Sequence, residues 1–147
     1  MNSSDELLIQ SAANIPPASQ KLAQVFTEHA GQLEARLNTI IASGKEFHTY
    51  QNANMQDLLR SNHHNQIQFF ASLLQQFNPV VLVKTLRWVF TTYQSHGIQI
   101  DYWKHFLPIW IKTLPDELSI LTENEIQPLL ELYNWVYHHV DDFAGEA

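Results

Sequence analysis

The chain has 147 residues, with eight Lys and Arg, fifteen Asp and Glu, eight His and no Cys. This length fits one domain with a real hydrophobic core. The formal net charge of −7 disfavours a nucleic-acid partner, and the lack of Cys excludes disulfides, thiol catalysis and Cys-ligated metals. The N-terminus is acidic, and no apolar run is long enough to span a membrane. We therefore expect a cytoplasmic protein that binds neither nucleic acid nor membrane.

The apolar residues recur at helical spacing almost throughout the chain. A short helix is predicted over Ser4 to Ala13, and the Pro16-Pro17 pair ends this N-terminal region (1–17). A long amphipathic helix follows from Ala18 to Ser43, and Gly44 is expected to close it in the left-handed conformation. Its apolar stripe comprises Leu22, Val25, Phe26, His29, Leu33, Leu37, Ile40 and Ile41.

The segment from Lys45 to Asn62 has a weaker pattern. Either Ser61 or Asn62 caps a new helix, or one continuous helix runs through His63 and His64. The Asn78-Pro79 pair is a strong start signal, because Asn accepts free N–H groups and Pro has none to lose. The helix that it starts, 79–95, is the most apolar in the chain, and we expect it to be the most buried. His96, Gly97 and Ile98 predict a Schellman ending that brings Ile98 back to Tyr93.

The last third of the sequence predicts two more helices. Asp101 caps one from Tyr102 to Leu114, which Pro108 kinks and Pro115 ends. Thr122 and Glu125 form a capping box for the final helix, Glu123 to Asp142, and residues 144–147 are expected to fray. The fold class is all-α: a single domain (1–147) of six to seven helices with bundle or globin-like packing.

Aromatic residues gather around the junction between the helices 79–95 and 102–114. Such a stripe is typical of a core, yet a kinked helix that carries Trp and Tyr also makes a wall for a flat apolar ligand. The candidate pocket consists of Trp88, Tyr93, His96, Trp103, His105 and Trp110.

The histidines suggest two further kinds of site. A haem ligand needs one histidine in an apolar pocket, and His29, His96 and His105 are candidates. His138 and Asp142 have the spacing of helical metal ligands, but we prefer to interpret them as a solvated pair near a helix end and expect no metal site. No catalytic or phosphate-binding motif is present, so we expect no enzyme and no obligatory cofactor.

From Trp88 the sequence follows the pattern W-V-F-x-x-Y-x-x-x-G-I-x-x-x-Y-W-x-x-x-L-x-x-W-I-x-x-L. Over Leu73 to Tyr137 the chain resembles the all-helical regulatory domains of bacterial signalling proteins. These include non-haem globin-like sensors and helical segments beside corrinoid-binding domains. The corrinoid-binding motif itself is absent. The resemblance implies a sensor-like or partner-binding module without catalytic residues.

These observations predict a non-enzymatic regulatory or protein-interaction module that forms a homodimer and binds a protein partner. The dimer surface is expected on Leu22, Phe26, Leu33 and Leu37, or on the tyrosine-rich last helix. The alternative is a globin-like sensor for a small ligand or a tetrapyrrole such as haem.

Overall fold

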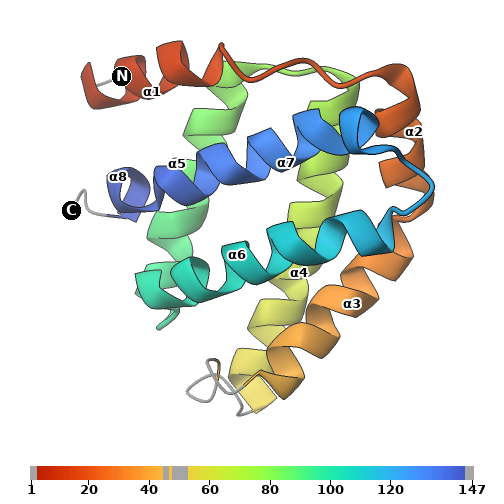
Figure 1. The fold of residues 1–147 in the computed structure, drawn as a ribbon. Coiled ribbons are helices and arrows are strands. Elements are labelled where there is room, and N and C mark those ends of the chain that lie inside the picture. Colours follow the sequence, from red (N-terminus) through yellow and green to blue (C-terminus); the bar gives the residue numbers. More distant parts are fainter. Residues whose placement is uncertain (1–2, 45–46, 48–52, 145–147) are drawn as a thin grey trace.

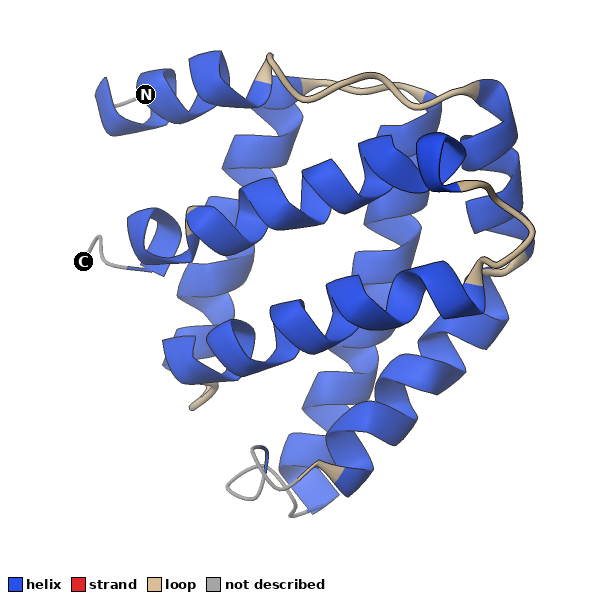
Figure 2. Ribbon diagram, in the orientation of Figure 1, coloured by secondary structure: helices blue, strands red, loops and turns tan. Residues whose placement is uncertain are grey.

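The computed structural model describes residues 3–44, 47 and 53–144, which fold into α-helices without any β-strand (Figures 1 and 2). The all-α prediction is confirmed. Residues 145–147 of the predicted frayed tail lie outside the described residues. The helices in this described part are α1 (Ser3–Ala12), α2 (Gln20–Glu28), α3 (Ala30–Ser43), α4 (Ala53–Gln75), α5 (Pro79–Ser95), α6 (Ile100–Glu117), α7 (Glu123–His138) and α8 (Val140–Ala144).

The helices form two crossed layers. Helices α6 and α7 lie side by side in front, and they cross α4 and α5, which run behind them (Figure 1). Helix α3 packs on α4, whereas α1 and α8 both pack on α5 at the side where the described chain begins and ends (Figure 1). Among the helices of the described part, none is both long enough and apolar enough to cross a lipid bilayer.

Two histidines divide helices that the sequence predicts as continuous. His29 separates α2 from α3, and His139 separates α7 from α8. The ring Nδ1 of His29 lies 2.8 Å from the carbonyl oxygen of Val25, which also accepts the backbone N–H of His29. The prediction of unbroken helices over 18–43 and 123–142 was therefore wrong.

The predicted caps are mostly confirmed. The Asn78 side chain accepts the N–H groups of Val80 and Val81. Gly97 has φ +95°, and the N–H of Ile98 donates to the Tyr93 carbonyl at 2.9 Å, as in a Schellman ending. Thr122 and Glu125 form the capping box.

Three boundary predictions need correction. Gly44 has φ −78° and is extended, so it closes α3 without left-handed geometry. Gln99 stands at the N-cap of α6, and Asp101 lies in its first turn. Helix α6 also continues through Pro115 to Glu117, since a proline removes one hydrogen bond without stopping the turn that follows. Helix α4 is continuous through His63 and His64, as one of the two alternatives predicted.

The residues predicted to form a dimer surface on α2 and α3 are buried in the core. Leu22, Phe26, Leu33 and Leu37 are all 0% exposed, because α2 and α3 turn this stripe towards α4, α6 and α7. These four residues are therefore not a dimer surface. Helix α5 is not the most buried helix either, since Trp88 on it is 63% exposed.

His63 connects three helices inside this core. Its Nδ1–H donates to Asn38 Oδ1 of α3 at 2.7 Å, and its Nε2 accepts from the Tyr102 hydroxyl of α6 at 3.0 Å. The ring stacks on Phe106 with 6.2 Å between ring centres. Burial lowers the pKa of His63 from 6.5 to about 4, because desolvation penalises the imidazolium ion.

This burial predicts a loss of stability in mild acid. Between pH 6.5 and 4 the unfolded state binds a proton at His63 that the folded state does not bind, so stability falls as the pH falls. The free energy of unfolding should drop by about 2 kcal/mol between pH 7 and pH 5 on account of His63. Urea unfolding at both pH values would measure this drop. His63→Gln should remove it, whereas His64→Gln, at the exposed neighbour, should keep it. An equal drop in the His63 variant would contradict this origin.

Candidate functional site

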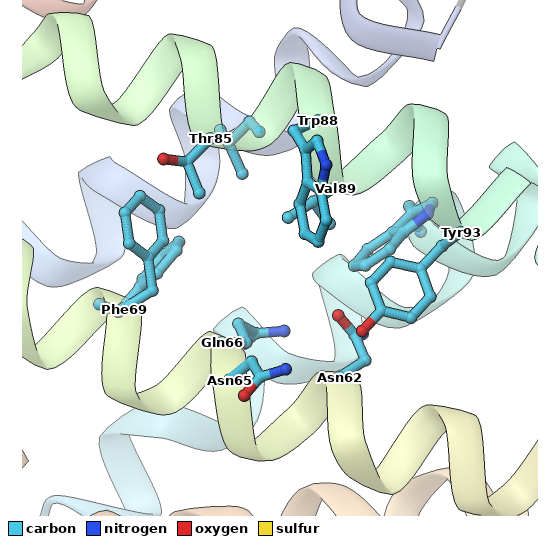
Figure 3. A pocket seen from close by; sticks show the side chains of 11 residues that line it. Asn62, Asn65, Gln66, Phe69, Thr85, Trp88, Val89 and Tyr93 are labelled. Carbon is cyan, nitrogen blue, oxygen red and sulfur yellow. The ribbon is translucent and has the colours of Figure 1, made fainter.

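An apolar pocket lies between α4 and α5, which face each other across it (Figure 3). Its volume is about 200 Å³, and Trp103 of α6 contributes to its inner wall. The lining residues are Asn62, Asn65, Gln66, Phe69 and Phe70 of α4, Thr85, Leu86, Trp88, Val89 and Tyr93 of α5, and Trp103. On α4 these positions recur at intervals of three and four, so one face of that helix makes one wall.

The pocket walls are mainly aromatic. Phe69 and Phe70 meet edge to face with 5.9 Å between ring centres. Trp103 is fixed against Phe90 at 4.8 Å and against Tyr102 at 5.0 Å. Trp88 stands at the rim, because it lines the pocket and is also exposed to solvent. This wall is therefore rigid on the α6 side and open on the α5 side.

Amide side chains of α4 take part in the pocket lining. The Tyr133 hydroxyl donates to Gln66 Oε1 at 3.1 Å, which fixes the amide and leaves its nitrogen on the pocket side (Figure 3). The side-chain nitrogens of Asn62 and Trp103 are buried and have no hydrogen-bond partner. Asn62 is only 3% exposed and reaches from α4 towards Tyr93 of α5 (Figure 3). The Trp110 indole nitrogen in the core is also buried without a partner, so unpaired donors are not confined to the residues of the pocket lining.

Tyr93 is the titratable group of this lining. Burial raises the pKa of its hydroxyl, and a hydrogen bond with the Asn65 side chain offsets part of that rise. The hydroxyl therefore stays protonated and uncharged at neutral pH. The lining contains no carboxylate, histidine, lysine or arginine. This arrangement can bind an uncharged molecule, and it offers no nucleophile with an adjacent base.

The structure brings together three of the six residues predicted as a pocket. Trp88, Tyr93 and Trp103 line the cavity, whereas His96 and His105 are exposed outside it. Trp110 is 0% exposed and belongs to the core, one turn of α6 beyond Phe106. Helix α6 turns Trp103 and Phe106 inward, so His105, between them, points to solvent. His96 is the C-cap of α5, and its ring lies against the Thr92 carbonyl of the same helix.

None of the α4 residues that line the pocket was predicted from the sequence. A signal was present, since Asn62, His63 and Gln66 occupy positions of an otherwise apolar stripe that includes Leu59, Ile67, Phe70 and Leu74. Polar residues on a core-facing stripe indicate either a buried network or a site. His63 makes the network, and Asn62 with Gln66 makes the site.

The residues proposed for haem do not converge on this pocket. His29 lies at the α2–α3 break, and the Nδ1–H of His96 donates to the Thr92 carbonyl at 2.8 Å. Neither these two nor His105 lines the pocket.

The pair proposed for metal binding also separates. His138 is exposed, and the Asp142 carboxylate instead lies 2.8 Å from Nδ1 of His139. Within residues 3–44, 47 and 53–144, no cluster of three or more His, Asp or Glu side chains has metal-binding geometry.

Comparisons with protein-family models, with curated proteins and with solved structures found no significant match to this chain. The function must therefore be argued from the geometry of the α4–α5 pocket itself.

The unpaired amide of Asn62 predicts a substitution that stabilises the empty protein. Leu has nearly the same volume and no donor to desolvate, so Asn62→Leu should raise the free energy of unfolding by about 1 kcal/mol. Urea unfolding at pH 7.5 would measure the change. The matched control is Asn38→Leu, which removes the partner of His63 and should lower stability. A less stable Asn62→Leu protein would show that this amide is satisfied.

Proposed function

We propose that this chain is a non-enzymatic binding module that holds a small, largely apolar molecule in the α4–α5 pocket. The observation that carries the proposal is a cavity of about 200 Å³ with mainly aromatic walls and amide side chains in its lining. Ligand sites in proteins have this composition: mostly apolar walls with a few polar groups that fix the orientation of the ligand. The lack of a charged or nucleophilic group in the lining favours binding over catalysis.

A regulatory role follows from where the pocket lies. Helix α5 carries one wall and packs against α1 and α8, so a bound molecule would press on the helix that holds both of these elements. Haem binding in this pocket is not supported, because no histidine lines the pocket to ligate the iron.

Naphthalene is a suitable probe for the pocket, because it is flat, uncharged and small. We expect it to bind at one site per chain and to shift the resonances of the Trp88 and Trp103 indoles in an NMR titration. Thr85→Phe places a ring in the pocket and should weaken binding at least tenfold, because the volume is taken. Thr91→Phe, at an exposed position of the same helix, should leave binding unchanged. Equal binding by both variants would place the probe elsewhere.

Self-association is a second candidate function, favoured by a strip of α5 on which exposed apolar side chains surround the exposed Lys84. Trp88 is 63% exposed, Val81 44% and Val80 37%, and Val81 and Trp88 lie two turns apart on one side of the helix. Exposed apolar patches commonly mark protein interfaces. This strip replaces the α2–α3 stripe as the surface on which a homodimer would form.

Sedimentation equilibrium at tens of micromolar protein should then give the mass of a dimer. Val81→Glu introduces a charge into the strip and should shift the protein to a monomer, because an unpaired charge in an interface is costly. Ile120→Glu is the matched control, since Ile120 is 65% exposed on the turn between α6 and α7. A monomeric wild-type protein would rule out the dimer.

A further inference from the structure

The carboxylates of the chain are unevenly distributed. The sequence has fifteen Asp and Glu residues, and none of them lies between Asp57 and Asp101. This stretch forms most of α4 and the whole of α5. Its residues 61–100 contain two charged side chains besides histidine, and one of these, Arg87, contacts α1 and α8. A chain with a net charge of −7 therefore has a pair of helices that contributes almost none of that charge.

The pocket opens on the surface of these two helices. Among its lining residues, Asn65 of α4 and Trp88 of α5 are exposed, whereas Trp103 of α6 is buried and closes the inner side. Exposed positions continue along both helices, because Ser72 lies two turns beyond Asn65 and Val81 lies two turns before Trp88. We call the surface formed by Asn65, Ser72, Val81 and Trp88 the α4–α5 face. A molecule in the pocket keeps the side that lies towards this face in water.

The composition of the α4–α5 face is that of an interface. The cores of protein interfaces are depleted in charged residues and enriched in aromatic ones, and Trp88 is 63% exposed at the centre of this surface. The exposed polar residues next to it on α4 and α5 include Asn65, Ser72 and Thr91. Amides and hydroxyl groups both donate and accept hydrogen bonds, whereas a carboxylate only accepts. Two identical copies of this surface can therefore pair with each other.

The net charge favours a second copy of the chain as the occupant of this face. Two chains that each carry a charge of −7 repel each other wherever their carboxylates meet. A two-fold dimer brings the same surface together from both copies. Pairing through α4 and α5 sets stretches without carboxylates against each other, and the long side chain of the exposed Lys84 can keep its charge in water at the edge.

We propose that a second copy of this chain docks on the α4–α5 face and covers the mouth of the pocket, so that the bound molecule and the second copy stabilise each other. Docking removes from water the apolar surface of the ligand that the open mouth leaves exposed. The coupling is reciprocal, because a dimer that binds the ligand more tightly is itself strengthened by the ligand. This inference rests on the proposed function and adds its partner and its regulation.

Naphthalene tests the coupling. The quantity to measure is the dissociation constant of the dimer, from sedimentation equilibrium at pH 7.5 with and without saturating naphthalene. The constant should be lower with naphthalene by about threefold or more. In Thr85→Phe, whose ring fills the pocket, it should not respond to naphthalene. The reciprocal measurement needs no variant: naphthalene should bind the wild-type protein more tightly above the dissociation constant of the dimer than below it.

A matched pair of substitutions tests the face. Ser72→Glu places a carboxylate on the α4 side of the α4–α5 face, outside the pocket lining, and should raise the dissociation constant of the dimer about tenfold. Ser119→Glu makes the same change at an exposed position on the turn between α6 and α7 and should keep the wild-type value. Both variants have the same net charge, so a difference between them reports the place of the carboxylate.

The outcomes separate this inference from the proposed function. Equal weakening of the dimer by both glutamate variants would show that the copies meet elsewhere. If naphthalene binds but leaves the dimer unchanged, the coupling is wrong and the ligand site stands. If the wild-type protein binds naphthalene and remains a monomer, the second copy is not the occupant and the face is left to a different protein. If naphthalene does not bind at all, the proposed function fails, and the coupling fails with it.

Discussion

The row of aromatic rings along α6 is the packing constraint on which the other helices depend. Tyr102, Phe106 and Trp110 stack with 5.7 and 6.3 Å between successive ring centres, and each is at most 1% exposed. Rings of this size hold the crossing helices away from α6, since a packed core does not collapse around large side chains. Trp103 leaves the row towards α5 and packs on Phe90. The α4–α5 pocket is the space that remains where α5 rests on Trp103 while α4 rests on Phe106.

His63 and Asn62 are adjacent buried polar residues of α4 that differ in their hydrogen bonds. His63 is buried, and both of its ring nitrogens have partners on other helices. Asn62 is equally buried, yet its amide nitrogen has none. A protein selected for stability alone would carry an apolar residue at position 62, because an unpaired amide only costs free energy there. His63 therefore specifies the packing of three helices, whereas the Asn62 amide nitrogen adds no hydrogen bond to that packing.

The helix caps could be predicted from the sequence, because each depends on hydrogen bonds between residues that are close in the chain. The Asn78 cap, the Gly97 ending and the Thr122–Glu125 capping box each involve residues within five positions of one another, so no tertiary knowledge was needed. Half of the pocket was also foreseeable from the aromatic content of α5 and α6. The α4 half was not, because periodicity tells which face of a helix is apolar and not which neighbour that face meets. For the same reason the stripe of Leu22 and Leu33 was mistaken for an interface.

Helix α5 joins the pocket to the two ends of the described chain through adjacent residues. Trp88 and Val89 line the pocket, and Arg87 next to them points the other way. The Arg87 guanidinium pairs with Asp5 of α1, donates to the carbonyl oxygens of Asp142 and Phe143, and lies over the Phe143 ring at 5.4 Å. A half-buried arginine with this many partners fixes α1 and α8 to α5. Any displacement of α5 by a bound molecule must therefore either carry these two helices with it or strain the contacts of Arg87. The exposed Trp88 would move as well, so occupancy of the pocket and the shape of the α5 surface are linked by one rigid helix.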